Sequence, residues 1–112
     1  MLERKVVEND IYVLSKAFAL RIVNLYKFLT EQKHEYIISK QLLRSGTSIG
    51  ANVHEAKNAQ SRPDFSSKMN ISLKEASESG YWLDLLYDAD YITKEAYDSI
   101  KFKVQNSKFK VK

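Results

Sequence analysis

The fold is decided by a stretch near the middle of the chain that reads Gln41-Leu42-Leu43-Arg44-Ser45-Gly46-Thr47-Ser48-Ile49-Gly50-Ala51-Asn52-Val53-His54-Glu55-Ala56. By composition its serines and glycines are typical of a loop. By period it is helical, because its apolar and small residues recur at steps of three and four. The residues of this face are Ile38, Leu42, Ser45, Ile49, Asn52 or Val53, and Ala56. The period therefore predicts a helix over about residues 36–59.

Two glycines inside that helix need a compensating interaction. Each costs about 1 kcal/mol relative to alanine in a helix interior. Gly46 and Gly50 lie one turn apart, so they leave a flat strip on which another helix can pack closely. A second strip of small residues, Ala76 and Gly80, occurs further along the chain. We expect the two strips to pack against each other.

Composition sets the fold class. A chain of 112 residues with 44% apolar residues is long enough for one domain with a single core. It contains one Pro and three Gly, and alternation typical of strands is scarce, which favours an all-α fold. Cysteine is absent, which excludes disulfides and thiolate metal sites.

The amino-terminal residues and the overall charge bear on location and partners. Met1 to Lys5 is charged and no apolar run follows, so no signal peptide is expected. No stretch approaches the roughly 18 apolar residues of a membrane span, and we expect a cytoplasmic protein with no membrane partner. The net charge of +4 permits nucleic acid as a partner without requiring it.

Three further helices are predicted. The first covers about residues 10–30, with Asn9 or Asp10 as its cap and Ile11, Leu14, Phe18, Ile22, Leu25 and Leu29 as its apolar stripe. A second row, Val13, Ala17 and Leu20, widens the apolar face. The third covers residues 63–88 after a Ser61 cap, and the fourth covers residues 93–108 after a Thr93 cap. Short connections predict an all-α, up-down-up-down antiparallel four-helix bundle that forms a single domain over residues 1–112.

The motifs that could carry chemistry are weak. Glu31-x-x-His34 resembles half of a di-iron ligand set, but such sites need the motif twice, and no Glu stands three residues before His54. Gly46 to Gly50 is not followed by the Gly-Lys-Ser/Thr of a phosphate-binding loop. We expect no catalytic residue, metal or cofactor. Instead we expect Arg44 and Glu55 in a polar network, and Ser and Thr hydroxyls bonded to carbonyls one turn back.

The carboxyl-terminal segment is basic. From Lys101 onward there are five lysines and no acid. Contact with nucleic-acid phosphates is one interpretation, and a solvated tail is the other. The candidate nucleic-acid-binding residues are Lys101, Lys103, Lys108 and Lys110.

At this point the residues also match a known family. The run Arg44 to Asn52, with Lys74-Glu75-Ala76 and Tyr81-Trp82-Leu83-Asp84-Leu85-Leu86, resembles the bacterial four-helix bundle proteins, also called 23S rRNA-intervening sequence proteins. Ser72 and Gly80 depart from the residues expected at their positions. By this resemblance the motif residues are expected to organise the bundle, and no catalytic residue is implied; they are Arg44, Ser45, Gly46, Ser48, Gly50, Asn52 and Glu55.

The resemblance also implies partners. Members of the family are similar to the accessory variability protein of diversity-generating retroelements. That relative forms a homopentameric ring whose basic surface engages a reverse transcriptase and nucleic acid. Other members are encoded within insertions in large-subunit rRNA genes. The resemblance thus implies a homo-oligomer, with RNA or DNA and a reverse transcriptase or ribosomal component as further partners.

Three classes of function remain open from the sequence. The first is an oligomeric bundle that binds nucleic acid or a ribonucleoprotein. The second is a protein-only adaptor or scaffold, with an apolar patch around Tyr81, Trp82 or Leu85. The third is an enzyme, against which stand two histidines, no cysteine and no phosphate-binding loop. We expect the first.

Overall fold

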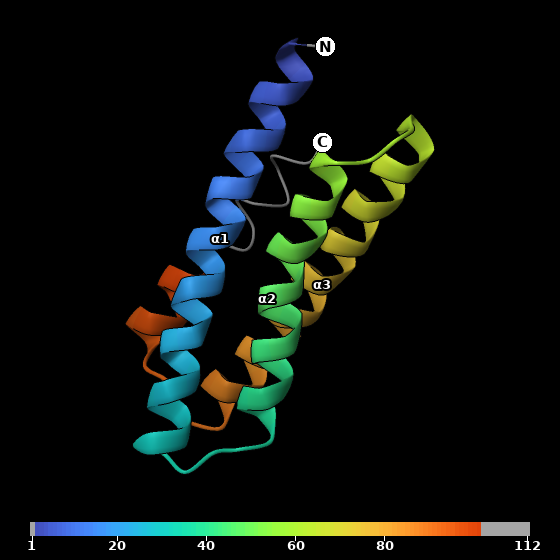
Figure 1. The fold of residues 1–112 in the computed structure, drawn as a ribbon. Helices are drawn as coiled ribbons and strands as arrows, with labels where there is room; N and C mark the ends of the chain where they lie inside the picture. Colours follow the sequence, from blue (N-terminus) through green and yellow to red (C-terminus); the bar gives the residue numbers. More distant parts are fainter. Residues whose placement is uncertain (1, 102–112) are drawn as a thin grey trace.

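The computed structural model describes the backbone of residues 2–101 and the side chains of residues 10–101. The described part is helical and contains no strand: α1 spans Leu2–Glu31, α2 spans Ile38–Lys57, α3 spans Arg62–Asp88, and a shorter helix begins at residue 94 and is described to residue 101. The predicted all-α four-helix bundle is confirmed. In Figure 1 the three long helices lie side by side and the short helix folds back beside α1. No helix of this part is long and apolar enough to cross a membrane.

The helix boundaries differ from the sequence prediction mainly at the ends of the chain. α1 begins at Leu2 rather than near residue 10, so Asn9 and Asp10 lie inside the helix and do not cap it. Residues 2–9 contain neither Gly nor Pro, so nothing in them stops the helix. α2 and α3 lie within two residues of their predicted limits, and residues 102–108 of the predicted fourth helix lie outside the described residues.

The core follows the predicted stripes. The main cluster is built from α1, α2, α3 and the short helix; its buried members are Phe18, Ile22, Leu25, Leu29, Leu42, Ile49, Ala76, Leu83, Leu86, Ile92 and Ile100. A smaller cluster of Ile11, Val53, Ala56 and Met69 closes the other end of the bundle. On α2 the choice between Asn52 and Val53 falls on Val53, which is buried while Asn52 is half-buried.

The glycines of α2 pack against α1, and the predicted pairing with Ala76 and Gly80 is wrong. A Cβ atom on Gly46 would lie 3.0 Å from Cγ1 of Ile22, and one on Gly50 would lie 3.3 Å from Oγ of Ser15. The nearest atom to a Cβ on Gly80 is Nζ of Lys101, at 3.3 Å. Small residues thus let α2 approach α1, and Gly80 leaves room for the lysine of the short helix.

Serines, not glycines, line the contact between α2 and α3. The buried hydroxyls of Ser45 and Ser79 form a hydrogen bond of 2.8 Å. Ser72 Oγ donates to the backbone carbonyl of Ile49 at 2.9 Å. Because both bonds are buried and join different helices, they stabilise the pair and fix its relative position.

The start of α2 is capped by Glu35, which lies in the connection between the first two predicted helices. Glu35 is 8% exposed, and its carboxylate accepts hydrogen bonds from the backbone N–H groups of Ile37, Ile38 and Ser39 at 3.1, 3.0 and 2.7 Å. Burial on its own would raise the pKa of Glu35, but these hydrogen bonds outweigh it and hold the pKa below its ordinary value. Glu35 therefore acts as a charged cap.

Two caps predicted from the sequence, Ser61 and Thr93, are confirmed. Ser61 Oγ accepts from the N–H of Asp64 at 3.2 Å at the start of α3, where Pro63 lies in the first turn. Thr93 Oγ1 accepts from the N–H of Ala96 at 3.2 Å before the short helix. Between them Asp90 adopts a positive φ of 65° after α3, which lets the chain turn back towards α1.

The second apolar row of α1 is not buried in the bundle, contrary to the prediction. Val13 is 64% exposed, Leu20 is 58% exposed, and Ala17 is also exposed. The main stripe alone faces the core, because α2 and the short helix flank α1 and leave its outer side uncovered. We call Val13, Ala17 and Leu20 the outer stripe of α1.

The close contact of α2 with α1 makes a prediction for the glycines. We expect Gly46→Ala to lower the free energy of unfolding by about 1–2 kcal/mol, because the added methyl group meets the buried side chain of Ile22. In Gly80→Ala the methyl group meets only the flexible end of Lys101, so stability should be unchanged or higher by up to about 1 kcal/mol. Urea unfolding of both variants measures the difference, and equal effects would contradict the packing described.

The capping role of Glu35 predicts a pH dependence. Because the pKa of Glu35 in the folded protein lies below its ordinary value of 4.5, its stabilisation is present above that pH and is lost as the pH falls through the folded pKa. Glu35→Gln should therefore lower the free energy of unfolding by about 1–2 kcal/mol at pH 7. Thermal unfolding across a pH series measures the difference in free energy of unfolding between the variant and the unmodified protein, and this difference should become smaller below pH 4.5. A difference that stays constant with pH would contradict a stabilising role for the charge of Glu35.

Candidate nucleic-acid interface

The charged residues of the α2 motif, Arg44 and Glu55, form ion pairs with residues of α3. Arg44 lies over the α2–α3 contact, where it donates to Glu75 at 3.2 Å and to Glu78. The indole N–H of Trp82 also donates to Glu78 at 2.9 Å. The hydrogen bond from Trp82, followed by the guanidinium of Arg44, lowers the pKa of Glu78 despite the opposing effect of burial. The polar network expected around Arg44 thus joins α2 to α3.

The other motif residues also make contacts within the protein. Glu55 forms a separate ion pair with Lys68 at 3.1 Å. Ser48 Oγ donates to the carbonyl of Arg44 at 2.6 Å, and Asn52 Nδ2 donates to the carbonyl of Ser48 at 2.8 Å, as expected of polar side chains on a helix. Together with Ser45, Gly46 and Gly50, these residues contact neighbouring helices or their own backbone, which are the contacts of a packing motif.

Lys101, one of the four lysines predicted to bind nucleic acid, forms contacts within the protein. Lys101 Nζ lies 2.7 Å from the carboxylate of Asp84 and 3.3 Å from the carbonyl of Gly80. Tyr97 donates to the same carboxylate at 2.6 Å. Burial would raise the pKa of Asp84, but the bonds from Lys101 and Tyr97 lower it, and the bond to Asp84 raises the pKa of Tyr97 to about 12. Lys101 therefore ties the short helix to α3.

The remaining lysines of that prediction are not placed by the structure. Lys103, Lys108 and Lys110 lie outside the described residues.

Glu31 and His34 are not predicted to bind a metal, because the sequence contains their motif only once. In the structure His34 Nδ1 lies 3.1 Å from the hydroxyl of Tyr36, and no group of metal ligands gathers within residues 10–101.

α1 and α2 each contain a long segment that carries basic residues and no acidic residue. Residues 11–30 contain Lys16, Arg21 and Lys27 but no Asp or Glu, and residues 36–54 contain Lys40, Arg44 and His54 but again no acid. Over its full span α1 contains five basic and four acidic residues, and α2 contains three basic and one acidic. α3 contains three basic and five acidic residues, two of which, Glu75 and Glu78, pair with Arg44 of α2. The α1–α2 half of the bundle therefore has a net positive charge and α3 a net negative charge, and the acid-free segments are the most basic part. The absence of Asp and Glu from residues 11–30 and 36–54 is visible in the sequence and could have revealed this charge distribution, which a run of lysines alone does not show.

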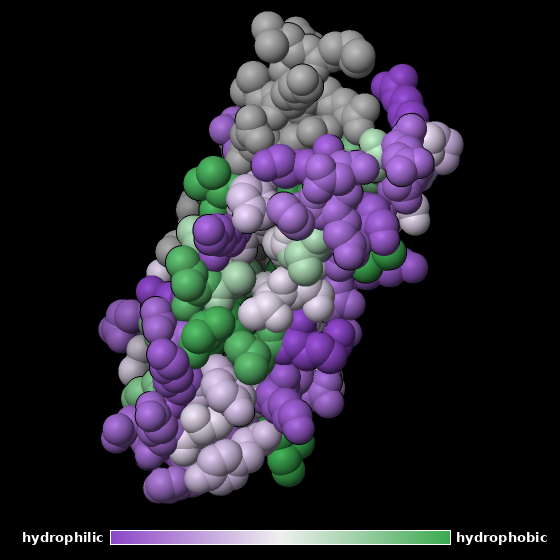
Figure 2. Space-filling model, viewed as in Figure 1, coloured by the Kyte–Doolittle hydropathy of each residue, from purple (hydrophilic) through white to green (hydrophobic). Residues whose placement is uncertain are grey.

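A shallow groove of about 280 Å³ runs between α1 and α2 on the basic half. Its lining residues are Tyr12, Lys16, Ala19, Thr47, Gly50, Ala51 and His54. The small side chains of Ala19, Gly50 and Ala51 keep the floor low, and none of the lining residues is acidic. In the view of Figure 2 hydrophobic side chains are exposed along α1, with hydrophilic side chains on either side.

Basic and aromatic groups meet at one end of this groove. Nζ of Lys57 lies 4.5 Å from the centroid of the Tyr12 ring, and the rings of Tyr12 and His54 are 5.6 Å apart. Lys57 and His54 are exposed. Cations beside a flat aromatic ring are the elements with which proteins bind the backbone and bases of single strands. We call Tyr12, Lys16, His54 and Lys57 the groove cluster.

Comparison with known proteins agrees with this architecture. Residues 7–111 match the family described as 23S rRNA-intervening sequence protein. The chain belongs to this family. Among solved structures, the chain is similar to a protein of unknown function from the S23 ribosomal protein family of Bacteroides thetaiotaomicron. The two share 52% sequence identity over 94% of each chain, with a TM-score of 0.92. No curated protein matches the sequence significantly.

The family resemblance stated from the sequence is therefore confirmed, and with it the fold. The similar solved structure is described as having unknown function, so this comparison assigns no activity to the chain.

Proposed function

We propose that the protein is a non-enzymatic, self-associating four-helix bundle that binds nucleic acid or a ribonucleoprotein through the basic half formed by α1 and α2. The observation that carries this proposal is the separation of charge between acid-free segments of α1 and α2 and the acids of α3. The family name adds a link to 23S rRNA. Cytoplasmic action is part of the proposal, because nucleic acid and ribosomes are found there.

Charge separation suits a polyanionic partner. Lysines and arginines that neutralise phosphates release condensed counterions, which favours binding strongly at low salt. The acids of α3 repel the same phosphates, so that a strand is oriented towards the α1–α2 face. The groove cluster supplies the aromatic ring and cations on that face.

The absence of a catalytic role is also part of the proposal. The side chains with shifted pKa values each have partners inside the protein: Glu35 caps α2, Glu78 binds Arg44 and Trp82, and Asp84 binds Lys101 and Tyr97. Such shifts arise from structural hydrogen bonds as readily as from active sites.

Self-association is supported by the outer stripe of α1. Val13 and Leu20 are more than half exposed, and an isolated helix face of this kind is commonly covered by another subunit. By the resemblance to the accessory variability protein, we propose a homopentamer. A reverse transcriptase or a ribosomal component is the proposed protein partner.

One observation favours the alternative of a protein-only adaptor. On α3 Tyr81 is 56% exposed, and its ring packs edge-on against that of Trp82, with the ring centroids 5.0 Å apart. An adaptor would use this patch and would show no salt-sensitive binding to nucleic acid. Pull-down with and without nuclease separates the two functions, because only nucleic-acid-dependent partners are lost after digestion.

If the protein binds nucleic acid through the α1–α2 half, removing lysines there should weaken binding more than removing the same number of lysines from elsewhere. Lys16→Ala with Lys57→Ala should weaken binding to a single-stranded RNA about tenfold at low salt and lower the slope of log K against log salt by about 1–2. Lys74→Ala with Lys94→Ala removes the same charge from α3 and the short helix, and should have little effect. Fluorescence anisotropy across a salt series measures both, and equal losses in the two pairs would locate the binding elsewhere.

The self-association proposal predicts a change of mass. Leu20→Glu places a charge in the outer stripe and should convert the oligomer to monomers, because a buried unpaired carboxylate is strongly unfavourable. Ile37→Glu is the matched control, since Ile37 is 77% exposed in the loop before α2 and away from the stripe. Light scattering after gel filtration reports the mass; an unmodified protein that elutes as a monomer would rule the proposal out.

A further inference from the structure

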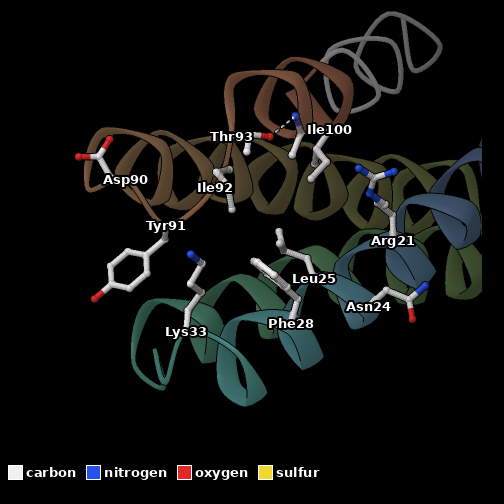
Figure 3. A pocket seen from close by; sticks show the side chains of 11 residues that line it. Arg21, Asn24, Leu25, Phe28, Lys33, Asp90, Tyr91, Ile92, Thr93 and Ile100 are labelled. Atoms are coloured by element: carbon white, nitrogen blue, oxygen red, sulfur yellow. Dashed lines mark hydrogen bonds between the residues drawn. The ribbon is translucent and has the colours of Figure 1, made fainter.

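A second hollow, of about 390 Å³, lies on the opposite flank of α1 from the groove cluster (Figure 3). It separates α1 from the chain that leaves α3 and forms the short helix. Its lining residues are Arg21, Asn24, Leu25, Phe28, Lys33, Asp90, Tyr91, Ile92, Thr93, Ala96 and Ile100. This volume falls within the range of small-molecule sites.

The inner wall of the pocket is apolar and includes one accessible aromatic ring. Leu25, Ile92 and Ile100 are buried core residues that form its base. Phe28 is 41% exposed, so part of its ring faces the open space. Figure 3 shows Leu25 and Phe28 pointing from α1 towards the side of Ile92 and Thr93. A flat ring could lie on Phe28 and be covered by the aliphatic side chains opposite.

The rim carries a positive charge at each end. Arg21 and Lys33 stand on opposite sides of Leu25 and Phe28 in Figure 3, and Nζ of Lys33 lies 5.8 Å from the centroid of the Phe28 ring. Arg21 is half-buried and has no ion-pair partner among the residues that the structure describes. Asp90 stands at the Lys33 end, so an anionic group is favoured at the Arg21 end.

We infer that this pocket holds one unpaired nucleotide of a single strand bound to the protein, with its base against Phe28 and its phosphate at Arg21. The inference rests on the proposed nucleic-acid binding and specifies its form. Bases that are free of a duplex stack on aromatic side chains, while arginine binds the phosphate. A base in a duplex has to be unstacked and unpaired before it can enter, which disfavours a duplex relative to a single strand. An acyl chain would leave Arg21 without an anionic partner, whereas a nucleotide supplies a flat ring together with an anion.

The test compares single-stranded and duplex forms of the same sequence, made as RNA and as DNA. Phe28→Ala should weaken binding to the single strand about tenfold, because stacking of one base is lost, and should leave duplex binding unchanged. Ala96→Leu fills the pocket and should act in the same direction without removing the ring. Tyr81→Ala, which removes an exposed aromatic residue from α3, is the control and should bind as the unmodified protein does.

Photo-crosslinking gives an independent readout. A single-stranded RNA with 4-thiouridine should crosslink to Phe28 or Tyr91, as located by mass spectrometry of the peptides, and Ala96→Leu should abolish these crosslinks. If the protein binds the strands with the expected salt dependence but crosslinks elsewhere, and neither variant alters affinity, the pocket assignment is overturned while the proposed function stands. If the unmodified protein binds neither strand nor duplex at low salt, the proposed function fails as well.

Discussion

The bundle depends on how closely α2 can approach two neighbours at once. On one side Gly46 and Gly50 bring its backbone against Ile22 and Ser15 of α1. On the other side Ser45 and the carbonyl of Ile49 meet serines of α3 through buried hydrogen bonds. A larger side chain at the glycines would force α1 outward, and an apolar residue at Ser45 would leave Ser79 with fewer partners. This unusual composition therefore belongs to a helix packed on both flanks.

The sequence was sufficient for the fold because periodicity and capping are local properties. The stripe of α1, the face of α2 and the caps at Ser61 and Thr93 were all predicted. The partner of the glycine strip was not, because a flat strip does not specify which helix lies on it. The cap formed by Glu35 was missed although it is local, because Glu is not among the preferred capping residues Ser, Thr, Asp and Asn.

The candidate site was less predictable than the fold. Lys101 was chosen from a run of lysines, but a charge pattern cannot show that a carboxylate, here that of Asp84, lies within 2.7 Å. The acid-free segments of α1 and α2 were visible in the sequence, yet their significance depends on the two helices lying side by side. The pocket at Phe28 depends on the path of the chain after Asp90, which composition does not determine.

The serine contacts between α2 and α3 also determine which parts of the molecule can adjust to a ligand. Sliding α3 along α2 would separate Ser45 from Ser79 and Ser72 from its carbonyl, and each buried group left unpaired costs about 1–3 kcal/mol. Among the described side chains no hydrogen bond joins α1 to α2; Ile22 and Ser15 pack against the glycines of α2, and Lys57 lies over the ring of Tyr12. A small shift of α1 along α2 would therefore leave no buried hydrogen-bonding group unpaired. Of the two neighbours of α2, α1 is the one whose shift costs less in hydrogen bonds, and both the groove and the pocket open along α1.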